Sequence, residues 1–324
     1  MKRYIFPLLM GILLIASCGP GKDKKENGSG NDKPAGDISG TLKIEAGNAV
    51  YALSRIWATE FAKAYPKVVT DVHKSDGMKA LRALLTGKAQ AAIIERPLTA
   101  GELSSGLWAV PVAKDALLPV INFDNQHIQS IVMSGLNKKQ LADIFTGKAK
   151  SWAALYNKKS IYPLKAYILQ DSCGSSDTWA QFLGIGATEL KGGSCTTDQE
   201  VIQSITQSPF SIGFCSMIFL YNNTTGILQK GLYIPPVDFN DNGQADDSEL
   251  FYDKWPDLKQ AINTGKYPSP PTREMYLVLK EKPKDKMLKE FVNWVLTIGQ
   301  NYTDQQGYIF IPKEKAAQLI KTME

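Results

Sequence analysis

Residues 167–182 read YILQDSCGSSDTWAQF, and this stretch decides how the rest of the chain is interpreted. The apolar run Tyr167–Leu169 predicts a short strand, and Trp179 and Phe182, three residues apart, predict the first turns of a helix. A helix start exposes backbone N–H groups and the positive end of the helix dipole, so residues 174–176 form a candidate oxyanion cradle. An ordinary strand–turn–helix with a serine cap has the same pattern, so the loop needs support from elsewhere in the chain.

The N-terminal half supplies further strand ends of the same kind. Apolar periodicity predicts strands over residues 42–46, 68–72 and 91–94, with helices over 53–65 and 78–85 between them. Alternating strands and helices imply a largely parallel sheet, and ligands bind outside the carboxyl ends of such strands. The three ends carry Asn48 and Ala49, then Ser75, Asp76 and Gly77, then Glu95 and Arg96.

Length and composition restrict the functional class. A chain of 324 residues, 44% hydrophobic and 21% charged, can form two domains with full cores. The net charge of +5 is mild, and no dense Lys/Arg stripe with interleaved aromatics occurs, so nucleic acid is not an expected partner. His73 and His127 lie far apart, and the sequence contains no zinc motif, nucleophile elbow, Walker loop or dinucleotide fingerprint.

The N-terminus predicts where in the cell the protein is located. Residues 1–18 combine a basic start, an apolar run over 4–15 and the ending IASC, which is the layout of a secretory signal peptide. The ending resembles a bacterial lipobox, which implies cleavage before Cys18 and acylation of that cysteine. Buried acyl chains, at ~0.8 kcal/mol per CH₂, would hold the protein on a bacterial membrane, at its periplasmic or surface face. Residues 19–39, rich in Gly, Lys, Asp, Asn and Pro, predict a flexible tether.

Three further cysteines fall in the body of the chain. In an oxidising compartment, one disulfide with one remaining thiol is plausible, but sequence does not fix the pairing. Cys173 and Cys195 both precede predicted helices and are the favoured pair. Cys215 lies in an apolar run and is expected to be a buried thiol.

Five segments together resemble a known family. In chain order they are LADIFTGKAKSWAAL, CGSSDTWAQFL, SPFSIGFCS, GKYPSPPTREMYLVLK and IGQNYTDQQGYIFIP, beginning at residues 141, 173, 208, 265 and 298. They resemble successive landmarks of the phosphate-binding protein family, the solute receptors of phosphate ABC importers, across roughly residues 41–322.

The resemblance implies the fold. It is an α/β, two-lobed type II periplasmic binding protein with mixed, mostly parallel sheets and two hinge crossings. Lobe I would contain residues 40–120 and 275–324, and lobe II residues 121–274. The crossings would lie near Leu118–Phe123 and Arg273–Leu279.

The resemblance also implies a binding site. Glu95 takes the place of the family's acidic residue, whose carboxylate accepts a hydrogen bond from protonated phosphate but not from sulfate. The family's bidentate arginine corresponds to Leu169 here, so Arg96 or Arg273 would have to replace it from another direction. The implied ligand-binding residues are Asn48, Ala49, Ser75, Asp76, Gly77, Glu95, Arg96, Gly174, Ser175 and Ser176.

Residues 238–249, DFNDNGQADDSE, match the calcium-loop pattern D-x-[DN]-x-[DN]-G-x₅-E throughout. We expect a structural calcium ion, and a solvated acidic turn is the alternative. The expected ligands are Asp238, Asn240, Asn242, Gln244 through its carbonyl, Asp246 and Glu249.

The sequence therefore predicts a binding protein and not an enzyme. The expected function is a lipid-anchored receptor that captures phosphate or a related oxyanion for an ABC transporter permease. A surface lipoprotein of the same fold that binds a different small ligand or a protein partner is the alternative. A hydrolase using Ser175 or Cys173 is disfavoured, because no general base can be placed beside either residue.

Overall fold

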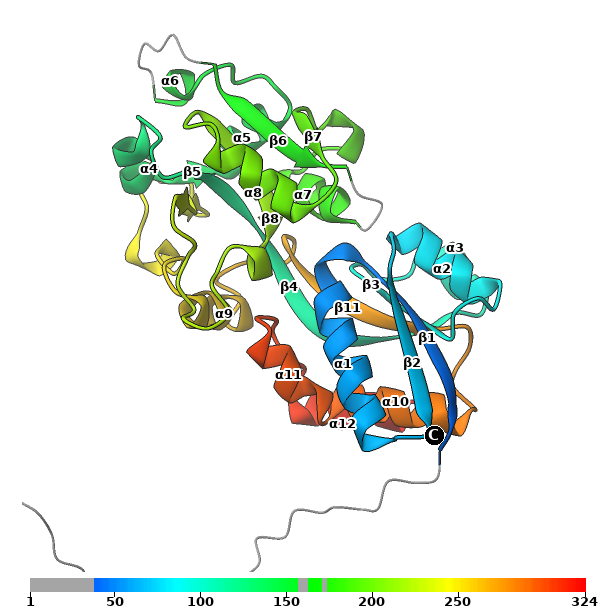
Figure 1. Cartoon of the computed structure of the whole chain (residues 1–324). Helices are drawn as coiled ribbons and strands as arrows, with labels where there is room; N and C mark the ends of the chain where they lie inside the picture. Colours follow the sequence, from blue (N-terminus) through cyan, green and yellow to red (C-terminus); the bar gives the residue numbers. More distant parts are fainter. Residues whose placement is uncertain (1–37, 157–162, 171–173) are drawn as a thin grey trace, which may run out of the picture. The chain divides into compact units, whose positions relative to one another are not determined.

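The computed structural model describes residues 38–156, 163–170 and 174–324 (Figure 1). The signal peptide, Cys18, the tether before residue 38 and Cys173 lie outside these residues. Within them, the segments whose apolar periodicity predicts strands or helices form those elements. The helix expected over 53–65 is α1, Tyr51–Ala64, and the strand expected over 91–94 is β3, Ala91–Ile94.

Nine of the strands that the structure describes form one sheet, in the order β2-β1-β3-β11-β4-β8-β6-β7, with β9 paired to β4. A second pairing joins β5 and β10. The strands are β1 Gly40–Ala46, β2 Val68–Lys74, β3 Ala91–Ile94, β4 Trp108–Asn122, β5 Leu136–Asn137, β6 Lys165–Leu169, β7 Gly193–Cys195, β8 Ser211–Ser216, β9 Leu232–Tyr233, β10 Val237–Asp238 and β11 Thr272–Leu279.

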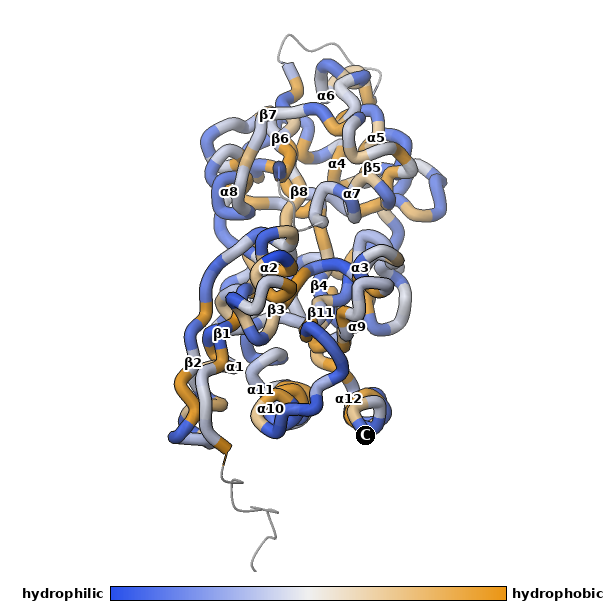
Figure 2. Tube along the Cα trace, turned by 90° about the vertical axis from the view of Figure 1, so that its right-hand side faces the viewer, coloured by the Kyte–Doolittle hydropathy of each residue, from blue (hydrophilic) through white to orange (hydrophobic). Residues whose placement is uncertain are grey.

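The helices alternate with these strands along most of the chain. Much of α10 is hydrophobic along the trace in Figure 2, and α10 carries Phe291 and Trp294 into a core. The α-helices are α1 Tyr51–Ala64, α2 Gly77–Leu85, α3 Ala100–Ser104, α4 Ile128–Ser134, α5 Lys138–Phe145, α6 Trp152–Leu155, α7 Ser175–Leu183, α8 Asp198–Thr206, α9 Trp255–Asn263, α10 Lys286–Leu296, α11 Gly299–Gln305 and α12 Lys313–Lys321. Short 3₁₀ turns are η1 Asn48–Val50, η2 Ala187–Glu189, η3 Met217–Phe219 and η4 Asp247–Glu249.

The sheet is mixed. β1 pairs in parallel with β2 and β3, and β6 pairs in parallel with β7 and β8. β4 and β11 lie between these groups and pair antiparallel, from Thr272 opposite Ala116 to Leu279 opposite Trp108. The apolar run over residues 116–123 predicts a buried strand, but β4 begins eight residues earlier, at Trp108, because its first half pairs along the whole of β11.

Two main hydrophobic cores support the sheet. Apart from Ile309, the buried members of one core fall within residues 116–267. The buried members of the other fall within residues 38–113 and 275–323. Segments from the two ends of the chain therefore share one core, which requires the chain to leave that core and return. It does so through β4 and β11, the two long strands that run side by side (Figure 1).

The cysteines differ in part from expectation. Cys215 is fully buried in β8, as predicted, and burial raises the pKa of its thiol. Cys195 is a free, buried thiol at the end of β7, with its Sγ 3.9 Å from Ser204 Oγ. The expected disulfide between Cys173 and Cys195 is therefore wrong, because Cys195 is free. This residue belongs to a strand rather than to a loop before a helix, so its side chain turns into the core.

Candidate functional site

The oxyanion cradle predicted at residues 174–176 is held by a buried aromatic cluster. Trp179 of α7 stacks on Phe214 with ring centroids 5.1 Å apart, and it packs edge-to-face with Phe145, with ring centroids 5.6 Å apart. These contacts fix the first turn of α7 to the core. Gly174 precedes α7 with φ +92°, and an added Cβ would lie 3.3 Å from Arg96 Cβ. Glycine is required there because other residues disfavour this backbone conformation.

A second glycine admits a carboxylate to the end of β1. Glu95, only 1% exposed, accepts a hydrogen bond from Ala49 N at 2.5 Å through Oε1. A Cβ on Gly47 would lie 2.7 Å from the same oxygen. The absence of a side chain at Gly47 therefore lets this loop approach the Glu95 carboxylate.

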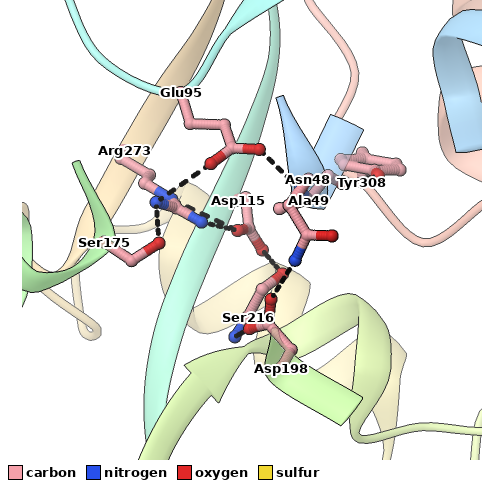
Figure 3. A network of polar contacts seen from close by, with 9 residues as sticks. All are labelled: Asn48, Ala49, Glu95, Asp115, Ser175, Asp198, Ser216, Arg273 and Tyr308. Atoms are coloured by element: carbon pink, nitrogen blue, oxygen red, sulfur yellow. Dashed lines mark hydrogen bonds and ion pairs between the residues drawn. The ribbon is translucent and has the colours of Figure 1, made fainter. Parts of the chain in front are cut away.

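Arg273 lies at the centre of the polar network (Figure 3). It comes from β11 and is buried, with 6% exposure. Its Nη1 donates to Ser175 Oγ at 2.8 Å and lies 3.8 Å from Glu95 Oε2. Its Nη2 lies 3.1 Å from Asp115 Oδ2. The Arg273 guanidinium thus joins the start of α7 to carboxylates that follow β3 and lie within β4.

The contact with Asp115 follows from strand register. Arg273 and Asp115 are direct partners in the antiparallel pairing of β11 with β4. Residues directly opposite in such a pair share a face of the sheet, so their side chains meet. Burial raises the pKa of the Asp115 carboxyl, and the adjacent Arg273 guanidinium opposes that rise.

The network continues beyond Asp115. Ser216 Oγ donates to Asp115 Oδ1 at 2.9 Å, and Ser216 N donates to Asp198 Oδ1 at 2.8 Å. Asn48 Nδ2 donates to the other oxygen of Asp198 at 3.1 Å. The network therefore holds three buried carboxylates: Glu95 and Asp115 lie against the Arg273 guanidinium, and Asp198 is joined to it only through Ser216 and Asp115. The arrangement offers both a cation for an oxyanion and acceptors for any proton that the oxyanion carries.

A pocket of about 700 Å³ adjoins this network. Glu95 and Arg273 form part of its wall, and Thr178 and Gln181 of α7 form another part. The turn that leads into β11 completes it with Pro268, among other residues. The buried charges therefore lie beside a space large enough for a ligand.

The structure brings only some of the predicted site residues together. Glu95, Asn48, Ala49 and Ser175 belong to the network (Figure 3). Ser176 Oγ instead donates to the carbonyl oxygen of Leu169 at the end of β6. That contact uses the Ser176 hydroxyl to close the loop between β6 and α7.

Arg96 and the loop after β2 have other contacts. Arg96 lines the pocket, but its guanidinium forms a two-point ion pair with Glu102, at 2.8 Å for each nitrogen. Asp76 caps α2 by accepting from Lys79 N at 2.8 Å, and it pairs with Lys79 Nζ at 2.9 Å. Ser75 N donates to Ala46 O, and Gly77 is the first residue of α2. Their predicted ligand contacts stay predictions.

Sequence reasoning missed Asp115, Asp198 and Ser216. Asp115 did offer a signal, because it directly precedes the apolar run over residues 116–123, and an aspartate is almost never fully buried unless it is paired. Asp198 and Ser216 offered none, since each has an ordinary neighbourhood in the sequence. The sequence indicates Arg273 only as a possible replacement for the family's arginine, and the structure places it in the network.

The calcium-type loop has its own hydrogen bonds. Asp238 and Glu249 are 2% and 4% exposed, and Glu249 Oε1 accepts from Phe239 N at 2.7 Å. Asp238 Oδ2 accepts from Gly243 N at 2.9 Å, with Gly243 at φ +77°.

The middle of this loop is held by amide contacts. Asn240 and Asn242 both donate to Asp246 Oδ2, while Gln244 N donates to Asn242 Oδ1. Across the described residues, no three His, Cys, Asp or Glu side chains form a group that could hold a metal ion. The oxygen-rich composition suits calcium, but its binding stays a prediction.

Among the helices that the structure describes, none combines the length and apolar character of a membrane span. Two cores linked by β4 and β11, with a buried polar network supplied by elements of both, define the class: an α/β solute-binding protein. The chain belongs to the PBP superfamily, whose domain model matches residues 31–297.

Comparison with known proteins narrows the relationship. The chain is 22% identical to phosphate-binding protein PstS of Staphylococcus epidermidis over 310 residues, covering 93% of this chain and 86% of that protein. It is 23% identical to PstS of Staphylococcus saprophyticus, covering 93% and 87%.

Solved structures have the same fold. A putative phosphate ABC transporter substrate-binding protein from Clostridium perfringens, solved with bound phosphate, superposes with a TM-score of 0.67 at 18% identity. The match covers 84% of this chain and 100% of that one. An ABC-type phosphate transport receptor from Vibrio cholerae gives 0.62 at 16% identity, covering 84% and 100%. The two-lobed α/β fold is thus confirmed, and the chain is a binding protein rather than an enzyme.

Proposed function

We propose that this protein captures phosphate, or a closely related oxyanion, and delivers it to the permease of an ABC importer. The observation that carries the proposal is the meeting of Arg273 Nη1 with Ser175 Oγ and the Glu95 carboxylate in one buried cluster. The relatives named phosphate-binding proteins, and the structural relative solved with phosphate, support the ligand class.

Each of the three groups has a distinct part in the proposed site. Leu169 stands where the family has its arginine, and it carries no charge. Arg273 supplies the positive charge in its place, from β11. Ser175 and the first N–H groups of α7 donate to the anion, at the positive end of the helix dipole. Glu95 accepts a hydrogen bond from a protonated phosphate oxygen, which disfavours sulfate.

The wider proposal concerns location. The lipobox-like ending before Cys18 supports a lipid anchor in the cell envelope, outside the cytoplasm, with residues 19–39 as the tether. Closure of the two lobes on the ligand would signal occupancy to the permease. A structural calcium ion in residues 238–249 would fix the position of η4 against β10.

Titration calorimetry tests the ligand. The mature protein should bind phosphate with micromolar or tighter affinity and sulfate at least about tenfold more weakly. Arg273→Gln should abolish phosphate binding, whereas the matched change Arg55→Gln on the exposed face of α1 should leave it intact. No phosphate binding by the wild-type protein would reject the proposal.

The acid-rich composition of the cluster favours the second candidate, a lipoprotein of the same fold with a different small ligand. Two buried carboxylates against one arginine, those of Glu95 and Asp115, disfavour a fully ionised dianion. Binding of a cationic or neutral solute, with no response to phosphate, would establish that candidate instead.

A further inference from the structure

An ion pair joins two helices that belong to different cores. Lys259 lies on α9 and Asp304 on α11, and the two helices lie next to each other in Figure 1. Lys259 Nζ lies 2.7 Å from Asp304 Oδ1, and it also donates to the backbone carbonyl oxygen of Asp304 at 3.2 Å. Lys259 is therefore attached to α11 at two points.

Each of these helices is fixed to its own core. α9 buries Leu258 in the core formed within residues 116–267. α11 begins at Gly299, whose carbonyl oxygen accepts a hydrogen bond from Trp57 Nε1 at 2.9 Å, and Trp57 is fully buried in the other core. The ion pair between α9 and α11 is thus a tie between the two lobes.

The surroundings of Lys259 support this tie. Its Nζ lies 4.4 Å from the centroid of the Trp255 ring, which is close enough for a cation–π interaction. The Trp255 ring packs against Gly307, where an added Cβ would clash with it. The Lys259 side chain is only 18% exposed, and its burial lowers the pKa of the amine while the adjacent Asp304 opposes that shift. Salt screens a partly buried pair of this kind less than it screens a fully exposed one.

The tie is connected to the wall of the binding pocket, although neither of its members lines that wall. Ile262 follows Lys259 by one turn of α9, and Tyr267 lies shortly after the end of this helix. Both residues line the pocket, and Glu95 lines it from the other lobe. The position of Lys259 against α11 therefore affects where one wall of the pocket lies relative to the Glu95 carboxylate.

We infer that Lys259 is a positioning residue for ligand capture: its ion pair with Asp304 holds the two lobes in the arrangement that assembles the site, without touching the ligand. This role rests on the proposed function, since it takes phosphate as the ligand. In the same arrangement Asn48 Nδ2 of one lobe donates to Asp198 Oδ2 of the other at 3.1 Å. Separation of the lobes, which releases the ligand, breaks the tie. The tie therefore favours the closed arrangement and slows the departure of phosphate.

Stopped-flow kinetics with the mature protein and inorganic phosphate test this role. Lys259→Met keeps most of the length of the side chain and removes its charge. The dissociation rate constant of phosphate should rise about two- to fivefold, as expected for the loss of one partly exposed ion pair, while the association rate constant changes little. Asp304→Asn should give a similar rise, and the double variant should rise no further than either single variant. A merely structural defect would lower the number of binding sites and leave the rate constants of the folded molecules unchanged.

Lys139→Met is the matched control. Lys139 pairs with Asp143 at 2.5 Å within a single helix, α5, so this variant loses the same charge without altering a contact between lobes. It should change neither rate constant.

Wild-type dissociation in Lys259→Met, or an equal rise in Lys139→Met, would overturn the role of Lys259 and leave the proposed function intact. No phosphate binding by the wild-type protein would overturn both. If Lys259→Met fails to fold, Asp304→Asn decides the outcome, because its side chain is 55% exposed and the change is small.

Discussion

Replacing Arg273 by methionine should destabilise the protein far more than an ordinary surface substitution. Arg273 is 6% exposed, and its partners Asp115 and Glu95 are 0% and 1% exposed. Methionine has a similar length but no charge, so the two carboxylates would lose their common cation. Removing one partner of a buried ion pair typically costs about 3–5 kcal/mol, because the remaining charge is left in a medium that solvates it poorly.

This cost is large compared with a total stability of about 5–15 kcal/mol. At roughly 2–4 °C per kcal/mol for a domain of this size class, the melting temperature of Arg273→Met should fall by on the order of 10 °C. Adding Asp115→Asn to Arg273→Met removes one of the two carboxylates that have lost their cation. The double variant should therefore melt higher than the sum of the two single losses predicts, with a coupling of about 0.5–3 kcal/mol.

The pH dependence of this loss of stability tests the same reasoning independently. Burial already raises the pKa of Asp115 in the folded protein, and the loss of Arg273 would raise it further. A carboxyl whose pKa is higher in the folded than in the unfolded state stabilises the fold at low pH, and this contribution is lost as pH rises through the folded pKa. The deficit of Arg273→Met relative to wild type should accordingly shrink as the pH is lowered from about 8 to about 5.

Differential scanning calorimetry of the wild type, the two single variants and the double variant measures these terms. A melting temperature for Arg273→Met within about 2 °C of wild type would refute the reasoning, as would strictly additive losses. Arg55→Met on exposed α1 serves as the control for the loss of one positive charge, and its effect should stay within about 0.5 kcal/mol.

Three other outcomes are expected. Glu95→Gln should narrow the preference for phosphate over sulfate at least about tenfold in competitive calorimetry, because an amide can donate to sulfate where a carboxylate cannot. An unchanged ratio of the two affinities would mean that Glu95 does not select the ligand. Gly47→Ala should weaken phosphate binding, since its Cβ would meet Glu95 Oε1 at 2.7 Å and displace a buried carboxylate. Its control is Gly87→Ala, which has open space around it and should lower only stability, because Gly87 has a φ of +73°. Calcium should raise the melting temperature of the wild type and not that of Glu249→Ala; a melting temperature indifferent to calcium in both would identify residues 238–249 as a solvated turn.

Local periodicity predicted most of the secondary structure correctly. The segments of β1, α1 and α2 each have a clear apolar period, and each of these burial patterns depends on residues close in the chain. β4 was expected to begin eight residues later, because residues 108–115 owe their strand conformation to pairing with β11, more than 150 residues away in sequence. Cys195 was misjudged for the same reason, since β7 exists only through its pairing with β6.

The sequence by itself determined the class of protein, the helix start at Ser175 and the carboxylate at Glu95. Each of these depends on residue types and spacings within a few positions, or on a set of landmarks in a fixed order. Only the tertiary structure decided which cation joins them. Arg273 meets Asp115 because the register of β11 against β4 places them opposite one another, and the same strand brings Arg273 to the start of α7. Strand register is set by the packing of whole faces of the sheet, and no short stretch of sequence encodes it.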